Sequence, residues 1–190
     1  GCRISETVGL CWSDIDFEKK KIKVCKQLLY QDKQWCFAPL KTVNSYRSVN
    51  VTAEFAQYLA DMKMQHDAER KLYGDGYKRN FVTDRREPKK EKIIEVPDFI
   101  NVKANGEMLT TNGAKFLARI IKKDLGIHFK FHNLRHTYAT VLAENGLNPR
   151  YVQEMLGHSK LEFTLRYYTH ITEKMSDAAE NALTAAFRFD

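Results

Sequence analysis

The sequence predicts a mainly α-helical domain with a small three-stranded antiparallel sheet near its start, which is an α+β fold. Three observations support this prediction. The chain has 190 residues and is 43% hydrophobic, enough to bury one sizeable core, so residues 1–190 are expected to form one domain. Apolar residues recur at helical spacing through the last third. Short alternating segments bounded by turn residues lie in the first third.

A helix is predicted at the very start of the chain. In GCRISETVGLCWSDID, Ile4, Val8 and Cys11 or Trp12 stand at helical spacing. A helix that is already under way at the first residue is typical of an excised domain. We therefore expect the parent protein to continue upstream.

Three short strands are predicted next. They lie within residues 20–30, 34–39 and 46–51. Ile22 and Val24 alternate with lysines, so one face of the sheet is expected to be polar. A turn at Gln31 to Lys33 joins the first two strands, and the tip LKTVNSYR separates the second from the third.

Two helices are predicted in the middle of the chain. Thr52 is a good N-cap for the first, which reaches about Leu72. Its expected packing side carries Phe55, Leu59, Met62 and His66. The second is capped by Thr111 or Asn112 and ends before Gly126, after a short strand and an Asn-Gly turn within residues 98–109.

The last third is predicted to be densely helical. One helix ends at Gly146, and the next has Asn148 as its cap, Pro149 as its first residue and Gly157 as its stop. A capping box, Ser159 to Glu162, opens a further helix. The final segment, 173–187, has a narrow stripe of small and apolar residues. Such a helix can cover its own domain or dock into a neighbour.

The charge balance favours a polyanionic partner. The net charge is +7, from 31 Lys and Arg against 24 Asp and Glu, and a basic surface attracts phosphates. Many ribosomal and secreted proteins are equally basic, so this balance alone does not select nucleic acid. The charged segment 74–95 is either a solvated loop or a flap that contacts phosphates.

The cysteines and the hydropathy pattern predict a soluble cytoplasmic protein. All four cysteines lie in the first fifth of the chain without a CxxC pair, so reduced thiols are expected rather than disulfides or a zinc ribbon. No apolar run approaches the roughly 18 residues of a membrane span, and no signal peptide opens the chain.

Candidate chemistry gathers in the last third. His132 and His136 have metal-ligand spacing, but Asn133 stands where a metalloprotease motif needs glutamate. His132 and Arg135 share a helix face, and an imidazole with a guanidinium suits a phosphate. His158 follows a helix stop, where its side chain can project into a cleft, and the next helix carries two adjacent tyrosines.

These motifs together resemble the tyrosine recombinase, or phage integrase, family. HNLRHTYAT, LGHSKLEFT and YTH match the family's His-x-x-Arg, Gly-His and Tyr-x-His motifs in order. GCRISE is similar to the first-arginine box, and LKTVNSYR to the lysine hairpin Lys-Thr-x-x-Ser-x-Arg. The resemblance covers nearly all of the chain and implies the family's catalytic-domain fold, without the parent's N-terminal DNA-binding domains.

The resemblance also implies a role for each matching residue. Arg3 and Arg135 would clamp the scissile phosphate, and Lys41 on a mobile hairpin would protonate the leaving 5' oxygen. His132 would assist proton transfer, and His158 would donate to a non-bridging oxygen. Glu6 would support the site, and Tyr168 would be the nucleophile. The predicted catalytic set is therefore Arg3, Lys41, His132, Arg135, His158 and Tyr168.

The residue types suit this chemistry without the family. Two guanidiniums can stabilise charge on a phosphate's equatorial oxygens, so no metal or other cofactor is required. A phenol needs cationic neighbours to react at neutral pH, and a lysine with a lowered pKa can serve as the acid. The helical wheel and the spacing from His158 admit either Tyr167 or Tyr168. The context Tyr-Thr-His selects Tyr168, while His136 and His170 are expected to be structural or supporting.

The predicted function is site-specific recombination of double-stranded DNA, with integration or excision of a mobile element as the expected setting. Self-association into a tetramer on DNA is expected, with helix 173–187 as a possible contact. One alternative is a DNA-binding accessory protein of the same fold that has lost catalysis. Another is a metal-dependent phosphohydrolase built on His132 and His136. The DNA target sequence does not follow from the chain.

Overall fold

The computed structural model describes residues 1–168, 180 and 183–184. Its helices are α1 (Ile4–Val8), α2 (Ala53–Tyr73), α3 (Thr111–Leu125), α4 (Phe131–Glu144), α5 (Pro149–Leu156) and α6 (Leu161–Leu165), with 3-10 turns η1 (Trp12–Asp14), η2 (Val43–Ser45), η3 (Gly74–Gly76) and η4 (Pro88–Lys90). Its strands are β1 (Ile15–Asp16), β2 (Lys21–Val24), β3 (Gln27–Gln31), β4 (Gln34–Ala38), β5 (Arg47–Asn50), β6 (Phe81–Asp84) and β7 (Lys92–Glu95). The predicted helix 173–187 lies outside the described residues except at three positions.

The predicted combination of helices with a small sheet is confirmed, but the single three-stranded sheet is wrong. Two sheets form, β1-β2-β5 and β3-β4-β6-β7. The predicted first strand is divided at Cys25 and Lys26, because the buried Lys26 ammonium turns inward and donates to the Asp14 carboxylate. The two halves of that segment therefore enter different sheets.

The hairpin turn and the polar sheet face are confirmed. β3 and β4 pair with Gln31 opposite Gln34, and the two residues between them have positive φ angles of 50° and 62°. Two such residues form the tight turn that suits the twist of a hairpin. In β2, Ile22 and Val24 are buried while the flanking lysines are exposed.

The charged segment 74–95 is not a plain loop. It contains β6, which pairs in parallel with β4, and β7, which pairs antiparallel with β6. Thr83 and Val82 are buried, so this part of the segment belongs to the core. These strands are difficult to recognise in the sequence, because the apolar residues are few and are interrupted by charged ones.

The helix boundaries mostly follow the predicted caps. Thr52, Asn148 and Gly157 take the predicted capping positions of α2 and α5. Four details differ. The first helix begins only at Ile4, after its cap Arg3, and ends at Val8; α3 is capped by Thr110 rather than Thr111 or Asn112; and α6 follows Lys160 without the predicted side-chain cap.

The fourth difference concerns the packing side of α2. Phe55 is 45% exposed, while Ala56 is buried beside Leu59. Ala56 thus takes the place of Phe55 on the inward side, whereas Leu59 and Met62 pack against the β2–β5 cluster and His66 meets the Trp12 ring, as predicted. The region 98–109 forms two isolated bridges rather than a strand, with Asn105-Gly106 at the predicted turn.

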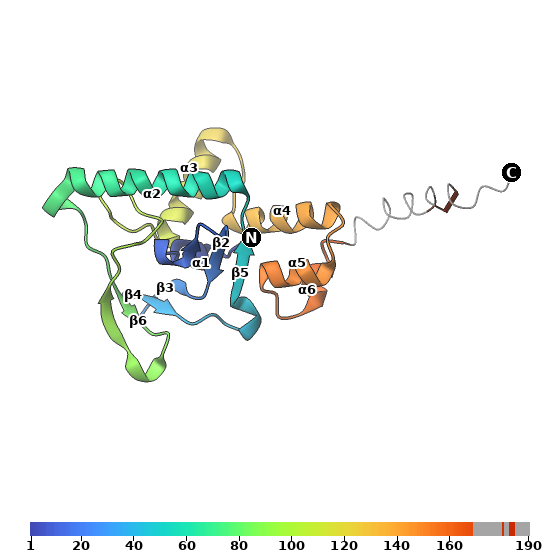
Figure 1. Ribbon diagram of the computed structural model, residues 1–190, viewed down its shortest axis with the longest axis horizontal. Helices are drawn as coiled ribbons and strands as arrows, with labels where there is room; N and C mark the ends of the chain where they lie inside the picture. Colours follow the sequence, from blue (N-terminus) through green and yellow to red (C-terminus); the bar gives the residue numbers. More distant parts are fainter. Residues whose placement is uncertain (169–179, 181–182, 185–190) are drawn as a thin grey trace.

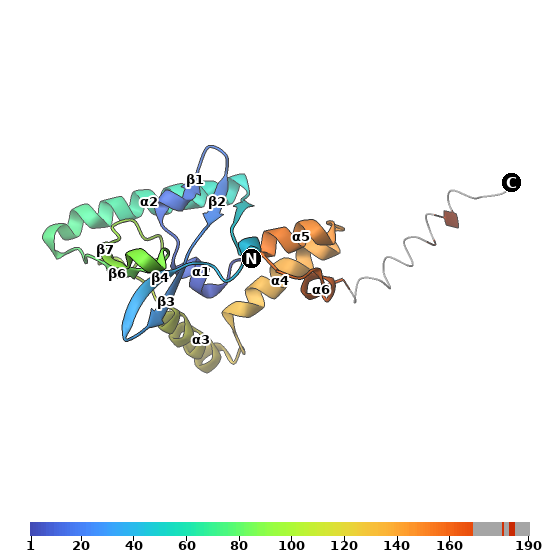
Figure 2. The ribbon, with the colours of Figure 1, turned by 90° about the horizontal axis from the view of Figure 1, so that it is seen from below.

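Three apolar clusters build the core. One joins α1, β3, β4 and β6 around Leu28 and Phe37, and a second lies between the β2–β5 pair and α2 around Val24. The third joins α4 and α5 around Ala139, Val152 and Leu156. Figures 1 and 2 show α4, α5 and α6 as a separate group beside the two sheets, with the N-terminus between them. In the described part of the chain, no helix has the length and apolar character of a membrane span.

Candidate active site

Arg135 joins the α4–α6 group to the start of the chain. Its side chain is only 3% exposed. One nitrogen, Nη1, donates to the Gly1 carbonyl and the other, Nη2, donates to the Leu156 carbonyl at the end of α5, both at 2.6 Å. Burial, with Arg3 and Arg47 nearby, lowers the pKa of Arg135 to about 10. The guanidinium therefore remains charged at neutral pH.

Arg3 and Glu6, at the first turn of α1, lie near Arg135 and form a charged cluster with it. The Arg3 backbone N–H donates to Glu6 Oε2 at 2.9 Å, and its Nη1 donates to Oε1 at 2.8 Å. The Glu6 side chain is 1% exposed, whereas that of Arg3 is 40% exposed. Burial alone would raise the pKa of Glu6, but hydrogen bonds from Arg47 and Arg3 outweigh it and leave the pKa lowered. The carboxylate is thus ionised and orients Arg3.

His158 sits directly after the left-handed Gly157, as the helix stop predicts. Its Nδ1 shares a 3.0 Å hydrogen bond with the fully buried hydroxyl of Thr164. Burial, together with the positive charges of Arg135 and Arg3, lowers the pKa of His158 to about 4. The imidazole is therefore neutral at pH 7 and can take part in hydrogen bonds without adding charge.

His132 lies at the start of α4, within the same electrostatic cluster. Its ring meets that of His136 edge to face, with centroids 4.5 Å apart. Burial lowers the pKa of His132, and His136, Arg135 and Arg3 lower it further. The structure thus brings four predicted residues together: Arg3, His132, Arg135 and His158.

The two tyrosines lie in the turn after α6 rather than within that helix as predicted, and they have different surroundings. The Tyr167 hydroxyl shares a 2.7 Å hydrogen bond with Nδ1 of His136, and its ring is nearly parallel to that of His158. The Tyr168 hydroxyl instead donates to the Leu147 carbonyl. Burial raises the pKa of both phenols, and the charge of Arg135 opposes this only for Tyr167. In this structure Tyr167, not the predicted Tyr168, adjoins the histidine–arginine cluster.

Lys41 is also outside the cluster. It is exposed on the segment between β4 and η2. No hydrogen bond or ion pair joins its side chain to the rest of the described chain. The residues around it are ordered by local bonds: the Leu40 N–H donates to the Tyr46 hydroxyl at 3.2 Å, and the hydroxyls of Thr42 and Ser45 share a 3.0 Å bond.

Arg47 is the buried charge that sequence reasoning missed. It is the last residue of the predicted lysine hairpin, and its side chain is 4% exposed. Its Nη2 donates to Glu6 Oε2 at 2.9 Å, and its Nε donates to the Met155 carbonyl at 2.8 Å. The final arginine of Lys-Thr-x-x-Ser-x-Arg was the available signal, but nothing in the sequence indicates its partners.

The arginines of segment 74–95 are largely neutralised. Arg79 pairs with Glu95, Arg86 with Asp84, and Arg85 with both Asp32 and Glu91. Guanidiniums already paired with carboxylates are weaker phosphate ligands than free ones, so these pairs favour a structural role over a phosphate-binding flap.

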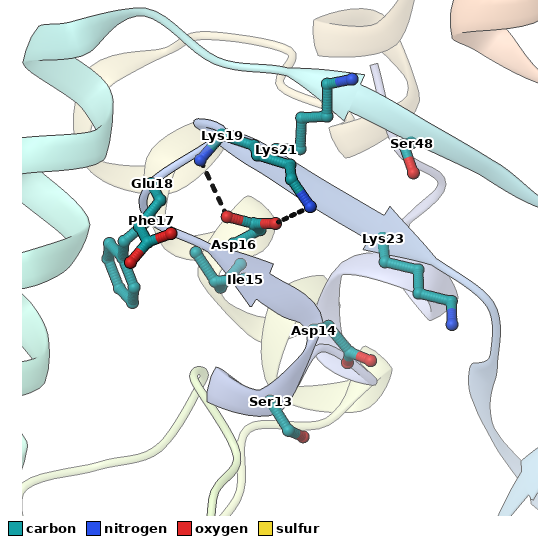
Figure 3. A pocket seen from close by; sticks show the side chains of 10 residues that line it. All are labelled: Ser13, Asp14, Ile15, Asp16, Phe17, Glu18, Lys19, Lys21, Lys23 and Ser48. Atoms are coloured by element: carbon teal, nitrogen blue, oxygen red, sulfur yellow. Dashed lines mark hydrogen bonds and ion pairs between the residues drawn. The ribbon is translucent and has the colours of Figure 1, made fainter.

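A hollow along the β1–β2 hairpin is separate from the cluster. Figure 3 shows its lining, which includes three lysines and the carboxylates of Asp14, Asp16 and Glu18. Lys19 lies 3.4 Å from Asp16, and none of the predicted site residues lines the hollow. In the residues that the structure describes, no group of three or more His, Cys, Asp or Glu side chains is arranged to hold a metal ion.

Comparison with known sequences identifies related proteins. The profile of the phage integrase family matches residues 1–175. A tyrosine recombinase XerC-like protein of Caldanaerobacter subterraneus is 32% identical over 205 residues, covering 98% of this chain and 47% of the relative. The transposase of transposon Tn916 from Enterococcus faecalis is 29% identical over 179 residues, covering 90% of this chain and 40% of that protein.

Solved structures give the same likeness. The integrase of transposon Tn1549, in complex with transposon right end DNA, superposes with a TM-score of 0.73 at 27% identity, covering 96% of this chain and 55% of that one. The XerA recombinase, at 22% identity and a TM-score of 0.55, shares the fold. The chain spans about half the length of the relatives it matches.

Proposed function

Because the chain belongs to the phage integrase family, we propose that it is the catalytic domain of a tyrosine-type site-specific recombinase. It cuts and rejoins strands of double-stranded DNA through a 3'-phosphotyrosyl intermediate. The observation that carries this proposal is the cluster of Arg3, Arg135 and a neutral His158, in which Arg135 links the start of the chain to the end of α5 by two hydrogen bonds.

The cluster suits a phosphodiester in its transition state. Charge develops on the non-bridging oxygens, and oriented guanidiniums in a partly desolvated site stabilise it strongly. Arg3 is half-exposed and can meet a ligand, while Arg135 lies deeper, with two of its nitrogens already bonded to carbonyls. The neutral His158 can donate to one of the phosphate oxygens without raising the local positive charge further.

The reaction we propose is a transesterification. The Tyr168 oxygen attacks phosphorus, a P–O bond to tyrosine forms, and the bond to the 5' oxygen breaks. His132 assists removal of the phenol proton, and the Lys41 ammonium gives a proton to the leaving oxygen. The free 5' hydroxyl of a different strand then attacks the phosphotyrosyl bond, which forms a new phosphodiester and releases Tyr168. Because one ester bond replaces another at each step, no external energy source is consumed.

This mechanism requires two movements from the present arrangement. Tyr168 has to release the Leu147 carbonyl, and Lys41 has to approach the cluster from its exposed segment. Because nucleophile and acid both lie outside the cluster in this arrangement, cleavage depends on both movements. The same observation also favours the second candidate, an accessory DNA-binding protein without catalysis.

The setting we propose is integration or excision of a mobile element. The similarity to a Tn916 transposase and to a Tn1549 integrase solved with transposon DNA supports this setting. The net charge of +7 suits DNA as the partner. Recombination between two sites further requires several protomers, and residues 173–187, predicted from the sequence to be helical, are the segment we propose for contact between them.

A nicked suicide DNA substrate tests the proposal, using the full-length parent protein. The short cut strand diffuses away, so the protein remains covalently attached to DNA. We expect an SDS-resistant complex with the wild type and none with Tyr168→Phe. An accessory protein would bind the DNA in a gel-shift assay but give no covalent complex with cognate DNA.

A further inference from the structure

Arg47 is a single side chain that joins three segments distant in sequence. Besides its bonds to Glu6 and to the Met155 carbonyl, its Nη1 donates to the Ser45 carbonyl at 3.0 Å. Glu6 lies in α1 beside Arg3, Met155 lies near the end of α5, and Ser45 lies in the hairpin that carries Lys41. Each of the three segments supplies at least one predicted catalytic residue.

Two arginines donate hydrogen bonds to the last two backbone carbonyls of α5. Arg47 takes the Met155 carbonyl and Arg135 takes the Leu156 carbonyl. The final carbonyls of a helix lack partners within the helix and carry partial negative charge, so guanidiniums suit them well. Because His158 follows this helix end by two residues, its position depends on both arginines.

The backbone confirms how closely these parts approach. Gly157 has φ +66°, and a β-carbon built on it would lie 3.1 Å from Arg47 Nη1, from the Asn44 carbonyl oxygen and from Ser45 Cα. The turn before His158 is therefore in direct contact with the hairpin. A shift of Arg47 is transmitted to both.

We propose that Arg47 is a positioning residue for the phosphate site, a role that rests on the proposed recombinase function. Through Glu6 it fixes Arg3, and through the Met155 carbonyl it fixes the turn that carries His158, so that both meet the same phosphate. All three guanidinium nitrogens of Arg47 already donate to protein acceptors, so Arg47 acts through these partners and not on the DNA itself. Its planar fork holds donors on three separate nitrogens in fixed positions, whereas the compact lysine ammonium cannot span the same three acceptors.

The test compares Arg47→Lys with wild type in the full-length protein, on suicide substrates with a normal scissile phosphate or a neutral methylphosphonate. On the normal phosphate we expect cleavage to slow by about 10²-fold, the usual effect of a small misplacement of catalytic groups. The neutral substrate needs less oriented positive charge, so the variant's deficit should shrink there to less than about tenfold. Arg79→Lys, at an exposed ion pair, is the matched control and should cleave both substrates like wild type.

The outcomes separate this role from its alternatives. An equal loss on both substrates, or full activity of Arg47→Lys on the normal phosphate, overturns the positioning role. If Arg47→Lys fails to fold, Glu6→Gln decides by the same comparison, because it weakens the same link from the other side. A wild-type protein that forms no covalent complex contradicts the recombinase function itself.

Discussion

The hydroxyl of Tyr167 shares a 2.7 Å hydrogen bond with Nδ1 of His136. This bond places Tyr167 beside the cationic cluster, whereas the Tyr-Thr-His motif selects Tyr168 as nucleophile. We predict that Tyr167→Phe still forms the covalent DNA complex. The variant should lose about 1 kcal/mol of unfolding free energy, the usual net contribution of one hydrogen bond. Covalent trapping and urea denaturation measure the two effects.

The reverse pattern would change the assignment. If Tyr167→Phe abolishes the covalent complex and Tyr168→Phe retains it, the arrangement in this structure is the reactive one and the motif misleads. Tryptic mapping of the residue attached to DNA provides a check that does not depend on substitutions.

The depressed pKa of His158 predicts a pH-dependent stability. The pKa is about 4 in the folded protein, against 6.5 for an unperturbed histidine. Between these values the unfolded chain binds a proton that the folded chain does not, so stability falls as pH decreases from 6.5 and levels off below 4. The imidazole signal in NMR titration should have its midpoint near the lower value.

A matched variant isolates this contribution. His158→Gln has no titratable ring, so its stability should depend less on pH across that window than the wild type does. His132, whose pKa is also lowered, remains in both proteins and cancels in the comparison. Equal pH dependence in the two proteins would contradict the assignment.

DNA cleavage should not depend on a divalent metal ion. His132 and His136 contact each other edge to face, and the described residues supply no third ligand near them. In the proposed mechanism, two guanidiniums supply the positive charge that a metal ion would otherwise provide. We expect the rate of covalent trapping to be the same within about twofold in buffer with EDTA. Loss of activity in EDTA, restored by added zinc or magnesium, would support the phosphohydrolase alternative instead.

The buried pair of Lys26 and Asp14 should be important for stability. Their side chains are 7% and 9% exposed, and Asp14 also accepts the Cys11 N–H at 2.9 Å. Lys26→Met leaves a buried carboxylate without its cation, which typically costs about 3–5 kcal/mol. Urea denaturation measures this loss.

The control for this prediction is an exposed pair. Lys63→Met removes the partner of Asp67, where both side chains are largely in solvent, and should change stability by less than about 0.5 kcal/mol. Comparable losses in the two variants would mean that burial of the Lys26 pair has little energetic effect.

Several helix caps and a tight turn are predicted correctly, because they depend on residues close together in the sequence. Thr52 and Asn148 cap their helices, and Gly157 ends α5 in a left-handed conformation, because capping depends on residues only a few positions apart. The same holds for the two-residue turn between β3 and β4. The gathering of Arg3, Arg135 and His158 followed from the family resemblance rather than from any local pattern.

Long-range pairing could not be predicted in the same way. Lys26 reads as one more lysine of an alternating strand, yet its inward turn to Asp14 divides that strand between two sheets. The parallel pairing of β4 with β6 joins Cys36 to Thr83 across a large sequence separation. Arg47 reads as a surface arginine, and only its three partners in space reveal that it links the parts of the site.

The contact between Gly157 and the hairpin leads to the last prediction. Gly126 and Gly157 both end helices in the left-handed conformation, with φ +70° and +66°. Alanine in that conformation costs roughly 1–2 kcal/mol wherever it occurs. Around Gly126 the space is open, whereas a β-carbon at Gly157 would press on the backbone of Asn44 and Ser45 at 3.1 Å. The two glycines share a similar positive φ, so their surroundings are the main difference between them.

We predict that Gly126→Ala lowers the unfolding free energy by about 1 kcal/mol and leaves DNA cleavage unchanged. Gly157→Ala should lose about 2–3 kcal/mol, since the hairpin or the helix end has to move. Because that movement shifts Arg47 and His158 together, its cleavage rate should also fall by at least about tenfold. If both variants cleave alike while differing in stability, the contact stabilises the fold without setting the geometry of the site.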